Sequence, residues 1–229
     1  IAACQAVLRL AIAEDAGHLA KDGFRSADVT SQSLDASART ATADIVARET
    51  GIAAGLPAIV LLFEILEADD VSVELRGADG DALAAGDVVA DLRGPADAVL
   101  FAERTLLNLL GRLCGIATLS GAYADRLRGA KARVYDTRKT TPGWRRLEKY
   151  AVACGGCRNH RTSLADAFLI KDNHWKRSCR WRHGAASNRG RPAIRGVSGA
   201  KRLAGRNRGG HARATSRRPA GGPRYRAAG

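Results

Sequence analysis

Five side chains that carry or can gain a positive charge lie at the ends of strand-like segments or in a glycine-rich turn: Arg138, Lys139, His160, Arg161 and Lys171. Taken singly, each could be an exposed surface charge, as most Lys and Arg residues are. Gathered at one place, they would repel one another unless an anion lay among them. Arginine matches carboxylates and phosphates with two parallel hydrogen bonds. The set therefore predicts a binding site for a phosphorylated or multiply carboxylated small molecule.

Alternating strand and helix patterns position these side chains. Strands are predicted at Lys131–Tyr135 and Asp166–Ile170, and a helix is predicted between them at Trp144–Ala153. A strand–helix–strand unit implies a parallel sheet or barrel. Because ligands bind at the carboxyl ends of the strands in such folds, we expect the charged side chains to converge there.

The residues before Lys131 predict a smaller α/β region and two further helices. Strands are recognised by alternating apolar residues and helices by apolar residues three or four positions apart. Asp15–Ser33, which is rich in glycine and polar residues, is predicted to be a loop. The predicted strands are Thr40–Arg48, Val71–Leu75 and Asp87–Leu92, and the predicted helices are 1–15, Leu56–Leu66, a long one that opens at Pro95, and Thr118–Arg128.

The charge of the chain is distributed unevenly. The 229 residues include 37 Lys+Arg and 23 Asp+Glu, a formal net charge of +14, which as a whole suggests a nucleic-acid partner. Residues 175–229 hold 16 Lys+Arg and no acidic residue, whereas residues 1–174 have a net charge of −2. The chain-wide charge therefore does not class the whole protein as a nucleic-acid binder.

Other features of the composition bear on cellular location. The longest weakly polar stretch, Gly51–Phe63, is too short to span a membrane, and the first residues do not have the order of charges typical of a signal peptide. We therefore expect a cytoplasmic protein whose five cysteines are free thiols. The sequence has no methionine, so we expect it to be partial.

The cysteine pair Cys154 and Cys157, followed by His160, resembles part of a zinc site or a redox pair. No second pair with metal-ligand spacing occurs in the sequence, and the pair does not open a helix after a strand. Free thiols are therefore the favoured interpretation, and no metal ligands are assigned.

Four stretches, in this order, closely resemble quinolinate phosphoribosyltransferase: ERTLLNLLGRLCGIAT (103–118), DTRKTTPGWRRLEKYAV (136–152), GGCRNHR (155–161) and LIKDNH (169–174). The upstream stretches IAEDAG (12–17) and DVTS (28–31) agree with the same family, so the resemblance extends over residues 5–174. Four ordered motifs are a far more specific signal than one glycine pattern.

The resemblance implies transfer of a phosphoribosyl group from phosphoribosyl pyrophosphate to quinolinate, with loss of carbon dioxide and pyrophosphate, to give nicotinate mononucleotide for NAD synthesis. It implies that Arg138, His160 and Arg161 bind the quinolinate carboxylates and that Lys139 and Lys171 lie between substrate and phosphates as catalytic residues. It also implies a homodimer or larger oligomer, in which Arg104 reaches the site of a neighbouring subunit, and a requirement for Mg²⁺.

The family fold is an N-terminal α/β sandwich followed by an irregular α/β barrel. We assign residues 1–103 to the sandwich and 104–174 to the start of the barrel, which leaves the barrel incomplete. Within these regions, Cys157 replaces a glycine usual in the family and would strain its turn if the backbone there needed a positive φ. Cys114 stands where a serine is common.

Residues 175–229 show no resemblance to the motifs of the family. They contain 14 Arg, 10 Gly and 10 Ala, and too few apolar residues to offset the entropy of ordering a chain, so they are predicted to be disordered. They hold no acidic residue to bind Mg²⁺. A shifted reading frame in GC-rich DNA would produce this composition, and we expect the chain as written to be inactive.

Two alternatives remain open at this point. One is a paralogous phosphoribosyltransferase-fold protein of the molybdenum-transport-associated kind, acting on another substrate. The other is a basic protein that binds nucleic acid through residues 175–229, where the aromatic residues Trp175, Trp181 and Tyr225 could stack on bases.

Overall fold

The computed structural model describes residues 1–17, 24 and 27–169. Residues 1–166 form one compact unit, and Ala167 begins a second. The elements of the first unit are α1 (Ala2–Ala16), α2 (Val29–Ser33), the 3₁₀ turn η3 (Ala36–Ala38), β1 (Thr40–Val46), β2 (Gly51–Ile52), α3 (Pro57–Ile65), β3 (Ser72–Leu75), β4 (Ala82–Leu83), β5 (Val88–Pro95), α4 (Ala96–Arg126) and α5 (Arg145–Cys154).

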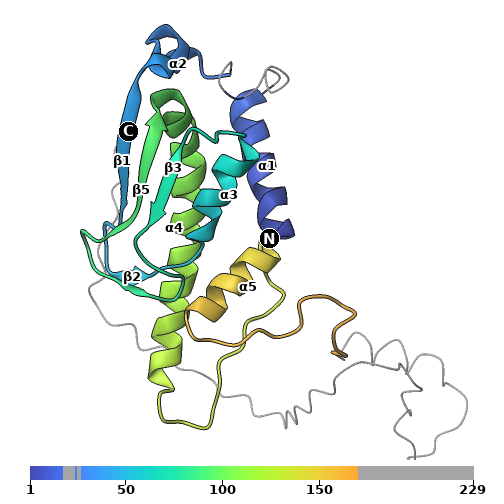
Figure 1. Ribbon diagram of the computed structural model, residues 1–229. Helices are drawn as coiled ribbons and strands as arrows, with labels where there is room; N and C mark the ends of the chain where they lie inside the picture. The colour runs from blue at the N-terminus through green and yellow to red at the C-terminus, as the bar shows by residue number, and fades with distance from the viewer. Residues whose placement is uncertain (18–23, 25–26, 170–229) are drawn as a thin grey trace, which may run out of the picture. The chain divides into compact units, whose positions relative to one another are not determined.

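An antiparallel sheet in the order β1–β5–β3 forms one side of the unit, and β2 and β4 pair as a separate short ribbon (Figure 1). The register of β1 on β5 runs from Thr40 opposite Pro95 to Ile45 opposite Ala90. Side chains along β1 alternate between exposed and half-buried, as expected of a strand with one face on a core. The central strand β5 is more deeply buried than either neighbour.

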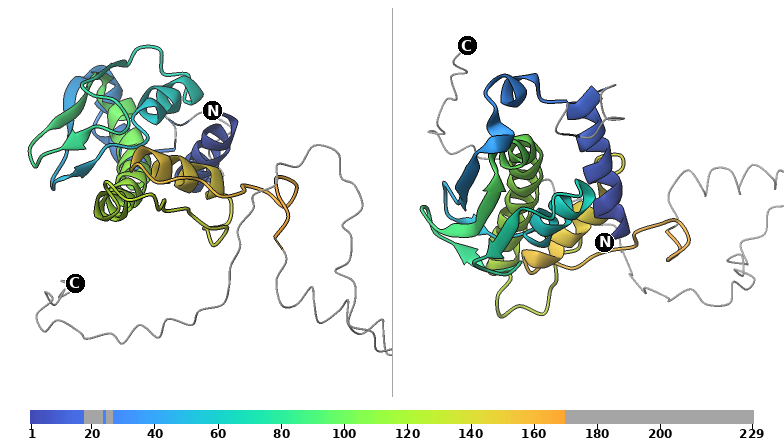
Figure 2. Two further views of the ribbon diagram at one scale, coloured as in Figure 1. Left: turned by 90° about the horizontal axis from the view of Figure 1, so that it is seen from below. Right: turned by 45° about the horizontal axis from the view of Figure 1, so that its top comes forward.

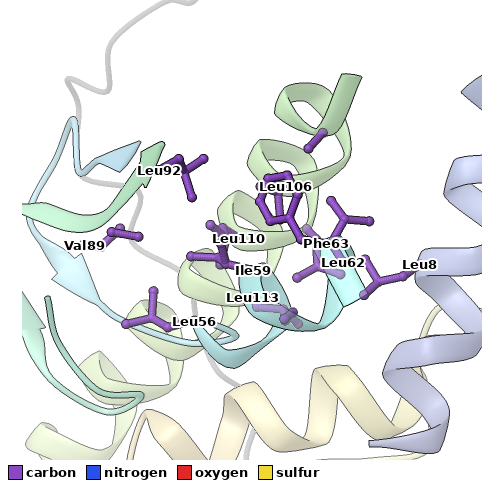
Figure 3. Packing of buried hydrophobic residues seen from close by; sticks show 14 of the residues in the cluster. Leu8, Leu56, Ile59, Leu62, Phe63, Val89, Leu92, Leu106, Leu110 and Leu113 are labelled. Atoms are coloured by element: carbon purple, nitrogen blue, oxygen red, sulfur yellow. The ribbon is translucent and has the colours of Figure 1, made fainter. Parts of the chain in front are cut away.

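Helices α3 and α4 pack beside this sheet, and α1 lies against them on the far side (Figure 2). The core between them is aliphatic, with Ile59 and Leu62 of α3 and Leu106 of α4 fully or almost fully buried (Figure 3). α3 begins with Pro57 in its first turn, where the absence of an N–H leaves no hydrogen bond unmade. These observations confirm the mixed α/β class predicted for the region.

The residues from Ala96 to Arg126 form one helix, whereas the sequence predicted two. The helix contains glycines at 111, 115 and 121, and each lowers helix stability by up to about 1 kcal/mol relative to alanine. Burial of one face against β5 and α3, and then against β2 and α5, outweighs that cost. α4 is also long and apolar enough to cross a membrane by length and composition, but it packs here as a core helix.

The region before α4 differs from the predictions in two respects. The predicted loop Asp15–Ser33 contains α2, because the Asp28 carboxylate accepts hydrogen bonds from the N–H groups of Thr30 (3.0 Å) and Ser31 (3.1 Å) and so caps a helix start. The two-residue strands β2 and β4 were not predicted. They are too short for an alternating pattern to reveal them.

The predicted strands Lys131–Tyr135 and Asp166–Ile170 do not form as strands within the described residues. Of the first, only Tyr135 pairs, through an isolated bridge. Residues 166–169 have no strand conformation, and Ile170 lies outside the described residues. A parallel ladder gains stability from neighbours on both sides, and in residues 131–169 this one bridge is the only parallel pairing. The predicted disorder of residues 175–229 also lies outside the described residues.

Candidate anion-binding site

A parallel β-bridge brings the two cationic motifs together. The N–H of Asp136 donates to the carbonyl oxygen of Arg158 (3.0 Å), and the N–H of Arg158 donates to the carbonyl oxygen of Val134 (2.9 Å). Tyr135 and Arg158 are the bridge partners, and their segments run parallel. Because the two segments are parallel, both continue past the bridge in the same direction. One leads to Arg138 and Lys139, and the other leads to His160 and Arg161.

A buried ion pair lies directly behind the two motifs. The Nζ of Lys149 on α5 is 2.5 Å from Oδ1 of Asp136, and these side chains are only 3% and 8% exposed. The same Nζ donates to the carbonyl oxygen of His160 (3.1 Å), and the N–H of His160 donates to Oδ1 of Asp136 (2.7 Å). α5 thus holds the ends of both bridge segments through one lysine.

The imidazole of His160 has a defined acceptor. Its Nδ1 accepts a hydrogen bond from the N–H of Arg161 at 2.8 Å. In the neutral ring the proton therefore lies on Nε2, because Nδ1 must keep its lone pair. The half-buried His160 can then offer an Nε2–H donor to an oxygen of a ligand.

Arg145, at the start of α5, joins the loops beyond the bridge. Its Nε donates to Oγ1 of Thr140 (3.2 Å), and its Nη1 donates to the carbonyl oxygen of Thr162 (3.4 Å). The loop that carries Arg138 and the turn that carries Arg161 are therefore fastened to each other on both sides of the cations.

The turn after Arg161 is closed by Asp166. Its carboxylate accepts hydrogen bonds from the Ser163 hydroxyl (2.5 Å) and from the N–H groups of Ser163 (2.9 Å) and Thr162 (2.7 Å). These bonds, first of all that from the Ser163 hydroxyl, lower the pKa of Asp166 to about 2. The carboxylate is therefore ionised at neutral pH and holds the turn.

Arg112 of α4 fastens the same loop from outside. Its guanidinium donates to the Thr141 hydroxyl and to the Glu148 carboxylate, and it lies 5.3 Å from the centre of the Trp144 ring. Partial burial raises the pKa of Glu148, but the hydrogen bonds from Arg112 and Thr141 outweigh it, so the pKa is lower than usual. Glu148 is thus ionised at neutral pH and pairs with Arg112.

The glycine-rich turn sits directly on α4. A Cβ atom at Gly155 would lie 2.2 Å from the carbonyl oxygen of Ala117, so only glycine fits this contact. Gly156 takes the positive φ of the turn, +82°, and Cys157 does not have a positive φ. The strain considered for Cys157 is therefore absent, and its thiol donates to the carbonyl oxygen of Ser120 (3.2 Å).

The predicted site residues fall into three groups. Arg138, His160 and Arg161 are half-buried at the joined motifs, and Lys139 is exposed beside them. The Nε of Arg138 is buried and makes no hydrogen bond within the part of the chain that the structure describes. Lys171 lies outside the described residues, so its predicted place is not tested.

Arg104 is not brought to the other cations. It is exposed on α4, eight residues before Arg112, which corresponds to about 12 Å along the helix axis. Its predicted role depends on a second subunit and stays a prediction.

Comparison with known protein families identifies the fold. Residues 28–114 match the description "Quinolinate phosphoribosyl transferase, N-terminal domain", and residues 116–190 match "Quinolinate phosphoribosyl transferase, C-terminal domain". The chain belongs to the quinolinate phosphoribosyltransferase family. The second match continues past His174, so the family likeness extends further than the motifs alone indicated.

Curated relatives match about two thirds of this chain. It is 45% identical over 157 residues to a probable nicotinate-nucleotide pyrophosphorylase (carboxylating) from Bacillus subtilis, and 44% identical over 148 residues to the enzyme of that name from Mycobacterium leprae. These alignments cover 69% and 64% of this chain, and 54% and 52% of the relatives. The chain therefore spans about half the length of the curated relatives that it matches.

Solved structures agree with the sequence relatives. NadC from Streptococcus pyogenes superposes with a TM-score of 0.67 at 36% identity, and the nicotinate-nucleotide pyrophosphorylase from Francisella tularensis with a TM-score of 0.68 at 32% identity. This chain covers 58% of each of them. The predictions of the family and of its α/β fold are confirmed.

Several residues that hold the candidate site together were not singled out from the sequence. They are Arg112, Asp136, Arg145 and Lys149. A lysine or arginine on a predicted helix is usually exposed, so charge gave no signal. The position of Lys149 in the helix gave no signal either. Leu147 and Ala151 are four residues apart and share the apolar face, whereas Lys149 lies two residues from each and is therefore expected on the opposite, exposed face.

No three His, Cys, Asp or Glu side chains lie close enough to hold a metal ion within residues 1–17, 24 and 27–169. Of the carboxylates at the site, Asp136 pairs with Lys149, Glu148 with Arg112, and Asp166 caps a turn. The described residues therefore do not form the Mg²⁺ site that the family resemblance implies.

Proposed function

We propose that this chain is the substrate-binding part of an enzyme that transfers a phosphoribosyl group from phosphoribosyl pyrophosphate to quinolinate. Carbon dioxide and pyrophosphate leave, and nicotinate mononucleotide forms. The observation that carries this proposal is the joining of the Arg138 loop to the His160–Arg161 turn through Asp136 and Lys149. It makes a dense group of donors with net positive charge, which suits a dicarboxylate.

The chemistry of these residues is positioning and electrostatic stabilisation. Arg138 and Arg161 would hold the two carboxylates of quinolinate, and His160 would add its Nε2–H donor. Lys139, exposed beside them, would face the negatively charged phosphates. Cations fixed in this way orient a dianion toward the electron-poor carbon that develops as pyrophosphate departs.

Three parts of the proposal depend on other copies or other residues. We propose a homodimer in which the exposed Arg104 serves the neighbouring site, and a catalytic role for Lys171. We also propose a requirement for Mg²⁺, held by residues that the described part does not supply. We also propose a cytoplasmic location, although some plant relatives are named chloroplastic or mitochondrial.

The names of the curated relatives support quinolinate over the substrate of a paralogue, because they are nicotinate-nucleotide pyrophosphorylases or quinolinate phosphoribosyltransferases. Binding of nucleic acid through residues 175–229 stays a prediction that lies outside the described residues.

An activity assay tests the proposal. The purified chain is mixed with quinolinate, phosphoribosyl pyrophosphate and Mg²⁺, and the formation of nicotinate mononucleotide is measured. We expect no product from the chain as written, and product from a fusion that adds the C-terminal half of the Bacillus subtilis relative after residue 169. Calorimetric titration of the chain alone with quinolinate separates binding from turnover. If the fusion folds but binds no quinolinate, the proposed substrate is wrong.

A further inference from the structure

We infer that Lys149 and Asp136 act as a positioning pair: together they fix the backbone on both sides of His160 and thereby set the place of Arg161 relative to Arg138. The ligand that benefits, a dicarboxylate, rests on the proposed function. The positioning itself rests only on the geometry of the described residues.

The contacts of the pair show which part of the chain it controls. The N–H of His160 donates to Asp136 (2.7 Å) and the carbonyl of His160 accepts from Lys149 (3.1 Å). These two groups belong to the two successive peptide planes that flank His160. Because both planes are held, the direction of the His160 side chain and the start of Arg161 are both defined.

Stability alone does not explain the pair. Lys149 and Asp136 are 3% and 8% exposed, and taking two charges out of water costs free energy that their attraction only partly repays. Well-packed apolar residues of similar volume are often as stabilising in such places. In addition, Oδ2 of Asp136 is buried without a hydrogen-bond partner among the described residues, which adds a further cost. What the pair provides instead is a fixed position for the backbone of His160.

Two substitutions in the whole chain test the inference. Lys149→Met keeps the length of the side chain but leaves the Asp136 carboxylate buried and unpaired, so we expect partial unfolding. The double variant Asp136→Asn/Lys149→Met removes both charges, and its asparagine can still accept from the N–H of His160. We expect the double variant to melt close to the temperature of the wild type. Methionine has no donor for the His160 carbonyl, however, so the turn stays loose.

Amide hydrogen exchange measures that looseness directly. The N–H of Arg161 lies on the same peptide plane as the His160 carbonyl, and we expect it to exchange at least tenfold faster in the double variant than in the wild type. The N–H of Leu62 in the core reports global opening and should not change. A purely structural role for the pair would move both amides together.

Quinolinate titration provides the second readout. We expect at least tenfold weaker binding in the double variant. The control Arg146→Met, which removes an exposed positive charge from the same helix, should bind within about twofold of the wild type. Wild-type exchange at Arg161 in the folded double variant would overturn the inference, with or without a change in binding. If the wild-type chain binds no quinolinate, the proposed function fails, and the exchange rates still decide the positioning role.

Discussion

Replacement of Gly155 by alanine tests the contact between the glycine-rich turn and α4. The added Cβ would lie 2.2 Å from the Ala117 carbonyl oxygen, 2.6 Å from Cβ of Ser120 and 2.9 Å from the backbone nitrogen of Gly121. Two of these three atoms belong to the backbone of α4, so no side-chain rotation relieves the overlap. The turn and the helix would have to separate by about 1 Å to reach an ordinary contact distance.

The expected cost follows from this displacement. Overpacking a well-packed interior costs about 1–3 kcal/mol when side chains can adjust, and here the backbone must move. We therefore expect Gly155→Ala to lower the free energy of unfolding by about 3 kcal/mol. The matched control is Gly111→Ala on α4, where an added Cβ meets no atom within 4 Å. Alanine in a helix interior should stabilise the protein by about 0.5–1 kcal/mol.

Urea denaturation followed by circular dichroism at equal protein concentration measures both variants. The midpoints should move in opposite directions, with Gly155→Ala lower and Gly111→Ala higher than the wild type. An unchanged midpoint for Gly155→Ala would refute the argument, because it would mean that the turn does not touch α4. A loss of equal size in both variants would show that α4 tolerates no added side chain at all.

Three further predictions concern charge and reactivity. Hydrogen bonds lower the pKa of Asp166 to about 2, so its stabilisation of the turn is fully present above the unfolded pKa of about 3.9 and is lost as the pH falls through about 2. The amide signal of Thr162, followed by NMR, should shift over this pH range in the wild type and should not shift in Asp166→Asn. Arg138→Lys should weaken quinolinate binding about tenfold in calorimetry, because an ammonium cannot form the paired hydrogen bonds of a guanidinium, and equal affinity would show that this side chain does not contact a carboxylate. Burial raises the pKa of the four described cysteine thiols, Cys4, Cys114, Cys154 and Cys157. Iodoacetamide at pH 7 should therefore label these thiols at least tenfold more slowly in the folded protein than in urea, which mass spectrometry measures.

The sequence was informative wherever a local signal specified a local structure. Pro57 before an apolar stretch predicted α3 to within one residue at each end. The motifs that carry Arg138, His160 and Arg161 were also recognised from the sequence, and the structure joins their backbones through one bridge. Their role in binding a ligand stays a prediction. Such signals depend on residues that are near one another in the chain. They are therefore visible without knowledge of the packing.

The features that the sequence did not predict depend on distant partners. Lys149 is buried because Asp136 and the His160 carbonyl surround its ammonium group, and none of these is its neighbour in sequence. α4 continues through three glycines because β2 and α5 cover its later turns. The isolated bridge at Tyr135 replaces a predicted strand because a strand-like stretch needs partners along its length to become a strand.

The continuity of α4 has a consequence for how this protein can be divided. The predicted border at residues 103 and 104, and the change between the two family matches at residue 115, both fall inside this one helix of 31 residues. Its earlier turns complete the core of the sheet, and its later turns support Gly155 and α5. Truncation of the gene at either border would remove from one domain the part of α4 that it packs against, and would leave the other domain with an exposed apolar segment of this helix. The two family domains are therefore distinct in sequence but share one helix in the folded protein. Exchange of a domain between relatives should give a folded protein only when the whole of α4 is taken from the same relative as one of the two domains.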